Sequence, residues 1–427
     1  MLDGGVDDED HLNTTLRNVL QDRAARDTIR RVHLVADDSE LSDSIISSLT
    51  ANRGGLRSNS MESFILWNRG DTSVDVSDFF AHYLFPKLQR LDLFNCAISS
   101  WDHLTFRTSV LTTLELNFDE DFDHDSPTPT TSQLLSILTS NPGLRKVQLS
   151  MCAIPEDGVE ESSTPVQLHH LKELRLEGDL RHVFKLLHRL DFPRNMDKLL
   201  LTLHNCDVTD VSQIVGPYLR DHLRRRDRPQ NGLGLWISSG TGYGVDHISL
   251  EAGSADGINF SAPEWERTDT FIEVAMPLEG APHKRVIERA ALDLITYVPL
   301  DEVVYLRAYD IPAAMEDTNT RFPNLRVLSF SNMSLTTAFQ NPNLIADGKV
   351  FPSLKHISLK SVDVGQGDWS PLTAFLACRV SSGNRLDTLE IADFSRMCSK
   401  VMKAIRSMVG ELKVGSPGTA CLCRTCS

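Results

Sequence analysis

Apolar residues recur along this chain in short segments of fixed spacing. Residues 88–98 read Leu-x-x-Leu-x-Leu-x-x-Cys-x-Ile, so the first, fourth and sixth positions are apolar and the residues between them are mostly polar. Related segments begin at positions 111, 144, 171 and 198, and a later series begins at 325, 354 and 386; within each series the starts are roughly 23 to 33 residues apart. Because alternation of apolar and polar residues is typical of strands, each segment predicts a short strand followed by a change of direction.

Between these strands the apolar residues take helical spacing. Leu134, Leu135 and Leu138 predict one helix, and Val183, Leu186, Leu187 and Leu190 predict another. A strand and a helix repeated at this period are typical of leucine-rich repeats. Parallel strands joined by right-handed crossovers then stack into a solenoid. The predicted fold class is therefore α/β: a leucine-rich repeat solenoid, or horseshoe, with parallel strands on the concave face and helices on the convex face.

The pattern also predicts where the chain departs from this regular repeat. We expect an N-terminal capping helix over residues 1–28, an irregular repeat domain over 29–414, and a flexible Cys-containing tail over 415–427. Near 232–275 the strands lie too close together for an intervening helix, and Gly240–Gly244 favours a turn. We therefore expect a β-hairpin or a pair of edge-like strands there. A helix over 211–219 should kink or restart at Pro217.

The residues that alternate with the apolar anchors should point to the concave face. Their mixture of both charge signs with aromatic side chains resembles a protein-binding surface more than a phosphate-binding one. The alternative is an ordinary solvated sheet face. The candidate partner-binding residues are Trp67, Arg90, Asp92, Phe94, Arg175, Glu177, His204, Arg307, Tyr309 and Lys360.

Composition narrows the expected partners and compartment. The formal net charge is −15, which disfavours binding to nucleic acid and to anionic membranes. No apolar run approaches the roughly 20 residues that cross a bilayer, and the acidic N-terminus differs from a signal peptide. The eight cysteines are scattered along a long chain. A reducing compartment, cytoplasmic or nuclear, is therefore expected.

No group of residues predicts catalysis, a cofactor or a metal site. Cys96, Cys152 and Cys206 occupy the ninth repeat position, where a thiol can fill a tight turn and donate weakly to a carbonyl oxygen. Cys421, Cys423 and Cys426 supply three thiols without a nearby fourth zinc ligand, which favours an untethered tail over a shared zinc site. Residues 119–125 are acidic but lack the Gly and Glu of an EF-hand loop. The basic run 224–228 complements a helix end, with nuclear targeting or RNA contact as the alternative. Because no nucleophile is paired with a base, we expect a protein that is not an enzyme.

The units Phe-Pro-x-Leu at Phe85, Phe322 and Phe351, together with the ninth-position cysteines, resemble the leucine-rich repeat region of F-box-like proteins of the divergent fungal type. The resemblance covers roughly residues 29–414. It implies a protein-interaction module, the substrate-recognition part of an F-box-type ubiquitin ligase receptor that docks on a cullin-ligase adaptor. The family's F-box opens near a Leu-Pro pair, whereas the first proline here is Pro86, so no F-box is recognisable and adaptor binding is assigned to no residue. The alternative is a leucine-rich repeat scaffold or regulator unrelated to ubiquitination.

Overall fold

A computed structural model describes the chain in two compact units, Met1–Thr202 and Leu203–Ser427. The described residues are 29–36, 46, 60–70, 73–82, 85–98, 101, 110–119, 128–151, 164–193, 195–225, 232–242, 245–255, 270–278, 284–309, 322–339, 351–364, 368–392 and 397–415. The predicted capping helix over 1–28 lies outside these residues, as does the predicted tail after Gly415. The chain is a mixed α/β protein whose strands are mostly parallel.

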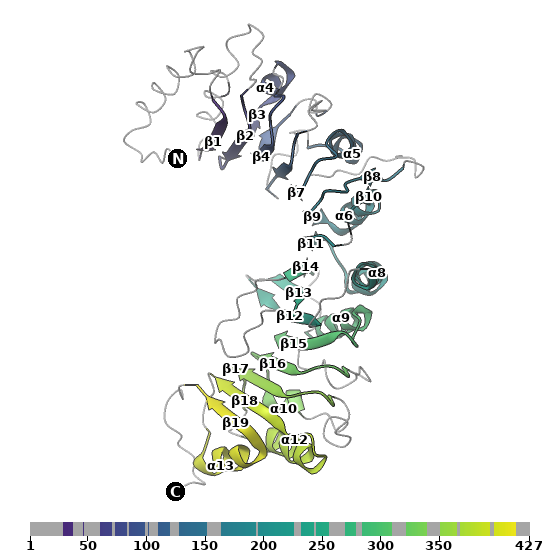
Figure 1. The fold of residues 1–427 in the computed structure, drawn as a ribbon. Coiled ribbons are helices and arrows are strands. Elements are labelled where there is room, and N and C mark those ends of the chain that lie inside the picture. The colour runs from purple at the N-terminus through teal and green to yellow at the C-terminus, as the bar shows by residue number, and fades with distance from the viewer. Residues whose placement is uncertain are drawn as a thin grey trace, which may run out of the picture. The chain divides into compact units, whose positions relative to one another are not determined.

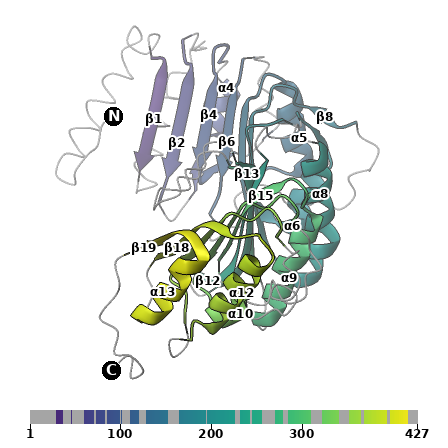
Figure 2. The same ribbon diagram turned by 60° about the horizontal axis from the view of Figure 1, so that its bottom comes forward.

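The strands of the first unit follow one another in chain order. They are β1 (Arg31–Ala36), β2 (Ser63–Asn68), β4 (Arg90–Phe94), β6 (Thr113–Asn117), β7 (Lys146–Ser150), β9 (Glu173–Asp179) and β11 (Lys198–His204), which spans the boundary between the units. The order is β1-β2-β4-β6-β7-β9-β11, and the pairs from β1 to β9 are parallel and in register. Figure 2 shows β1, β2, β4 and β6 side by side. The predicted parallel pairing is confirmed here.

Two small parallel pairs and three helices complete the first unit. The pairs join β3 (Val74–Asp75) to β5 (Cys96–Ala97) and β8 (Val166–Gln167) to β10 (Leu190–Asp191). The helices α4 (Ser77–His82), α5 (Thr131–Ser140) and α6 (Leu180–Leu187) lie on one side of the strands (Figure 1). The sequence predicted that Leu190 belongs to the same helix as Val183, Leu186 and Leu187, and this prediction is wrong. His188 ends α6, and Leu190 then pairs with Val166 in a strand.

The second unit contains the irregular section. Its strands are β12 (Leu233–Gly242), β13 (Val245–Ser254), β14 (Thr270–Pro277), β15 (Val303–Tyr309), β16 (Val327–Ser331), β17 (His356–Lys360), β18 (Leu386–Ala392) and β19 (Val409–Val414), in the order β14-β13-β12-β15-β16-β17-β18-β19. The predicted hairpin is confirmed, because β12 and β13 pair antiparallel, and β14 adds a third antiparallel strand. The edge-like alternative is wrong for β12, which also pairs parallel with β15 on its other side.

Helices of the second unit pack against these strands. They are α7 (Val208–Asp210), a π-helical turn (Val211–Val215), α8 (Gly216–Arg225), α9 (Lys284–Tyr297), α10 (Leu335–Phe339), α12 (Ser370–Ser381) and α13 (Ser399–Met408). The predicted restart at Pro217 is not seen, because residues 208–225 stay helical without a break. The helix changes from π to α geometry at Gly216, one residue before the proline. Helix α9 contacts β12 and β13, and α13 contacts β19.

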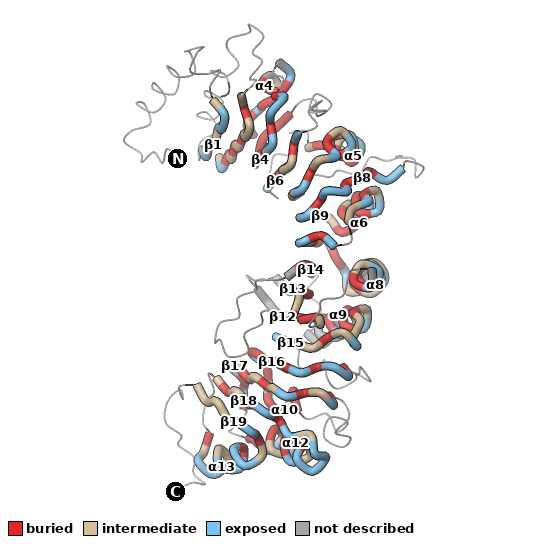
Figure 3. Tube along the Cα trace, viewed as in Figure 1, coloured by how far each residue is buried: buried red, intermediate tan, exposed pale blue. Residues whose placement is uncertain are grey.

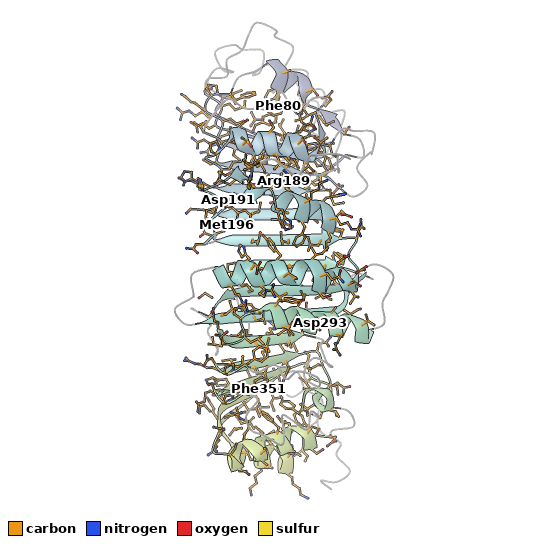
Figure 4. All side chains as sticks on the ribbon, turned by 90° about the vertical axis from the view of Figure 1, so that its right-hand side faces the viewer. Phe80, Arg189, Asp191, Met196, Asp293 and Phe351 are labelled. Atoms are coloured by element: carbon orange, nitrogen blue, oxygen red, sulfur yellow. The ribbon has the colours of Figure 1, made fainter. Side chains whose placement is uncertain are left out.

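The apolar anchors form the core of each unit. Along β2, buried and half-buried residues alternate, so Phe64 and Leu66 point inward (Figure 3). Phe64 lies in an aromatic cluster with Phe79, Phe80 and Phe85, whose ring centroids are 4.7 to 5.9 Å apart. Phe80 is labelled in Figure 4. This cluster explains why the sequence places an aromatic helical face directly before the Phe-Pro-x-Leu unit.

The three Phe-Pro-x-Leu units form the same turn. In each, the leucine N–H donates to the phenylalanine carbonyl: Leu88 to Phe85 at 3.1 Å, Leu325 to Phe322 at 3.3 Å and Leu354 to Phe351 at 3.2 Å. Each proline is exposed, and each phenylalanine and leucine is buried. The sequence unit is therefore a turn that directs the chain into the strand.

A left-handed residue follows several strands at the equivalent position. Asn95, Met151, Asn205, Asn332 and Ser361 come directly after β4, β7, β11, β16 and β17, with φ between 51° and 56°. For Asn95, Met151, Asn332 and Ser361, the backbone N–H extends the ladder: that of Asn95 donates to Asn117 at 3.0 Å, and that of Ser361 to Ala392 at 3.1 Å. Because most residues avoid this conformation, its recurrence marks a turn that the fold repeats.

Candidate functional site

In the first unit, one set of strand residues points away from the side on which the described helices lie. The in-register pairing aligns these residues into three rows that cross the strands. We call this set the strand face. Its members are Arg31, His33 and Val35 of β1, Ser63, Ile65 and Trp67 of β2, Arg90, Asp92 and Phe94 of β4, Thr113, Glu115 and Asn117 of β6, Lys146, Gln148 and Ser150 of β7, and Glu173, Arg175 and Glu177 of β9.

Asp92 lies at the centre of a hydrogen-bonded group on this face. Trp67 donates its indole Nε1–H to Asp92 Oδ1 at 2.9 Å, and Arg90 donates to Oδ2 at 2.8 Å. The Asp92 side chain is only 1% exposed, whereas that of Arg90 is 42% exposed. The sequence predicted an accessible Asp92, and this placement is wrong, because the long side chains on both sides cover the short carboxylate. Asp92 therefore orients Trp67 and Arg90.

Ion pairs continue from Arg90 across the next three strands. Glu115 lies 3.1 Å from Arg90 and 3.2 Å from Lys146, and Lys146 lies 4.0 Å from Glu173. The Glu115 side chain is 8% exposed, so this carboxylate is held between two cations and largely shielded from water. Such a chain fixes four long side chains at once, which lowers the entropy that a ligand would otherwise have to remove.

The far end of the strand face is held more loosely. Ser150 donates to Glu177 at 2.9 Å, and Arg175 lies 3.9 Å from the same carboxylate with its side chain 43% exposed. Gln148 donates to Asn117 at 3.0 Å. Arg175 is therefore an accessible cation at the β9 end of the strand face.

Charge on the strand face is balanced. Four cations (Arg31, Arg90, Lys146 and Arg175) stand beside four anions (Asp92, Glu115, Glu173 and Glu177). Recognition of a nucleic-acid backbone needs a net positive track, because neutralised phosphates supply most of the affinity. The arrangement instead offers aromatic rings between charges of both signs, without the net positive charge of such a track.

The predicted residues of the second unit lie on the corresponding strand rows there. Arg307 pairs in register with Trp236 and Ser329, and Tyr309 with Ser238 and Ser331. Lys360 lies beside Ser331 on β17. Tyr309 is 43% exposed, and Arg307 and Lys360 are half-buried. His204 ends β11 and is half-buried, on the side of the strand opposite the buried Leu201 and Leu203.

Sequence reasoning missed two aromatic residues in the second unit. Trp236 and Tyr305 have ring centroids 5.4 Å apart at 50°. Trp236 lies in the row that carries Arg307, and Tyr305 lies in the neighbouring row with Gly234 and Val327. Burial raises the pKa of the Tyr305 hydroxyl to about 12. The available signal was that Trp236 lies between the apolar residues Leu235 and Ile237, and that Tyr305 directly precedes the apolar Leu306. A template restricted to aliphatic anchors did not register either residue.

The ninth-position cysteines that the structure describes are buried. Cys96 Sγ lies 3.3 Å from the Phe94 carbonyl oxygen, and Cys206 Sγ lies 3.2 Å from that of Leu203. The predicted thiol–carbonyl contact is confirmed for both, while Cys152, like Cys421, Cys423 and Cys426, lies outside the described residues. Burial raises the pKa of the Cys96 thiol far above its usual range, so it is a poor nucleophile.

Within the described ranges, no group of three His, Cys, Asp or Glu side chains is arranged to hold a metal ion. None of the helices described there has the length and apolar character needed to span a bilayer.

Comparison with known proteins adds no relative. No model of a known protein family matches the sequence, and no curated protein matches it.

Proposed function

We propose that this chain is a leucine-rich repeat solenoid without enzymatic activity, and that its strand face binds a protein partner. The recurring left-handed residue after the strands supports the repeat architecture, because it gives successive units the same exit from the sheet. The shared Phe-Pro-x-Leu turn supports it as well.

One observation carries the binding role: the group formed by Trp67, Asp92 and Arg90 on a face that the described helices leave open. A buried carboxylate fixes an indole ring and a guanidinium, which are two of the three kinds of side chain enriched at binding hot spots. Phe94, half-buried beside Trp67 in register, extends the aromatic surface. Side chains held in place before binding lose less entropy on association.

Affinity purification of the full chain from native cells, followed by mass spectrometry, tests this role. We expect Phe94→Ala and Arg175→Glu to remove the same partner that the wild-type chain recovers. Lys185→Glu is the matched control, because Lys185 is exposed on α6, on the helical side. The proposal would be contradicted if the Lys185→Glu chain lost the partner while both strand-face variants retained it.

The ligase role implied by the family resemblance is a separate part of this proposal. A cullin-ligase adaptor should then be recovered equally by the wild type and by Arg175→Glu, because the strand face is assigned to the substrate. Recovery of the strand-face partner without any adaptor would favour a scaffold or regulator unrelated to ubiquitination.

A further inference from the structure

Strand β1 lies at the edge of the described sheet in the first unit. It pairs with β2 over Arg31–Ala36, and among the described residues no strand pairs with its other side. Its core-side residues Val32 and Leu34 are only half-buried, whereas their neighbours Phe64 and Leu66 in β2 are 0% exposed. The apolar side of β1 is therefore incompletely covered.

The other side of β1 carries accessible apolar and positively charged groups. Val35 is 47% exposed, and Arg31 and His33 are also exposed. Among the described residues, Arg31 has no ion-pair partner, in contrast to Arg90 in the same row. His33 contacts the edge of Trp67 at 5.8 Å between ring centroids.

We propose that β1 accepts an extended, acidic segment of a protein partner as an additional strand. A free strand edge offers backbone N–H and C=O groups to an incoming strand, and those bonds supply sequence-independent affinity. The added strand also covers Val32 and Leu34, which removes apolar surface from water. This inference concerns the edge of the sheet and does not rest on the partner proposed for the strand face.

The side chains of β1 define the sequence that fits. Successive residues of a strand point to opposite sides, so Arg31, His33 and Val35 face the same way. The incoming strand therefore places an acidic residue beside Arg31 and, four positions away, a β-branched residue beside Val35. Between these two positions, the incoming strand has two residues that point to the opposite side. They are apolar and lie against Val32 and Leu34.

Charge favours this occupant over a second copy of the chain. Two antiparallel β1 strands centred on His33 would place Arg31 opposite Val35 and supply no carboxylate to either guanidinium. A partner segment with an acidic residue at the Arg31 position supplies that carboxylate.

Selection from a phage-displayed random decapeptide library against the full wild-type chain tests the proposal. We expect selected peptides to share an acidic residue four positions from Val, Ile or Thr. Arg31→Glu and Val35→Lys should each weaken the best peptide by about tenfold in fluorescence anisotropy. The matched controls are Arg326→Glu and Val110→Lys. Both residues are exposed and belong to neither β1 nor β2, so these variants should bind the peptide unchanged.

Hydrogen exchange separates edge binding from face binding. Strand addition should protect the backbone amides of residues 31–36 in the peptide complex. Basic or unpatterned peptides, unchanged binding by both β1 variants, or absence of any selected peptide would each overturn the inference. So would a dimer that forms at high concentration and is lost in Val35→Lys. Peptides that need Phe94 and not Arg31 would overturn the edge proposal while supporting the strand-face proposal.

Discussion

Arg379 should be required for the stability of the second unit, because it is a buried cation bonded only to backbone carbonyls. Its side chain extends from α12 and the residue is 3% exposed. Nη1 donates to the Phe351 carbonyl at 3.0 Å and Nη2 to that of Leu354 at 2.8 Å. Phe351, labelled in Figure 4, begins the turn into β17. The guanidinium also lies 5.9 Å from the Phe375 ring.

Arg379→Met keeps most of the side-chain volume and removes both hydrogen bonds. A bond from a charged donor contributes about 1.5 kcal/mol at the lower end of its range, so the two together contribute about 3 kcal/mol. Removing the buried charge returns part of its desolvation cost, which we take as about 1 kcal/mol. The expected loss in the free energy of unfolding is therefore about 2 kcal/mol.

Urea denaturation followed by far-UV circular dichroism measures this loss. Arg326→Met is the matched control, because Arg326 is exposed and should change stability by less than about 0.5 kcal/mol. Hydrogen exchange should rise in residues 351–360 of the Arg379→Met chain and not elsewhere in the second unit. Wild-type stability of Arg379→Met would refute the reasoning, because it would mean that desolvation cancels both hydrogen bonds.

Three further predictions concern positions with equally defined surroundings. Ser361→Gly should raise the free energy of unfolding by about 0.5 kcal/mol. It removes a left-handed Cβ penalty of about 1–2 kcal/mol, and the extra backbone entropy of the unfolded chain costs about 0.5–1 kcal/mol. In the same urea assay, Ser358→Gly, within β17, should lower the free energy of unfolding. Trp67→Phe should lower the free energy of unfolding by about 1–2 kcal/mol, because buried Asp92 loses its indole donor. In a double-mutant cycle, the same substitution made in the Asp92→Asn chain should lower the free energy of unfolding by less. The raised pKa of Tyr305 stabilises the fold below the ordinary tyrosine pKa of about 10, and this contribution is lost as pH rises toward 12. Between pH 9 and 11, the wild type should therefore lose about 1 kcal/mol more stability than Tyr305→Phe, and equal losses in the two chains would contradict this assignment.

Periodicity predicted the strands because the side of a strand on which a residue lies depends only on its own position. The anchors Leu91 and Leu93 are buried as their spacing requires, and the hairpin near Gly240–Gly244 followed from the short distance between its strands. The depth of a residue depends on its cross-strand neighbours. Asp92 is covered by Trp67 of β2 and Arg90 of its own strand, and the sequence alone does not show how such side chains lean.

The aromatic residues of the second unit show a different limit. Trp236 reaches Tyr305 only because the chain, after β13, β14 and α9, returns as β15 and pairs with β12 more than 60 residues later. That pairing depends on the order of strands in the sheet, which local periodicity does not contain. The left-handed turn residues were missed for another reason. Met151 and Ser361 are not residue types that favour positive φ, so the geometry is imposed by the repeat.

The bond between Trp67 and Asp92 gives the strand face a built-in optical signal. Indole emission responds to the polarity and charge around the ring, and here the ring is half-buried with its N–H on a carboxylate. A molecule seated on the face displaces water from the ring, whereas one bound to the helical side leaves it untouched. Subtracting the spectrum of Trp67→Phe isolates this one fluorophore among the five tryptophans, so occupancy can be followed without a label.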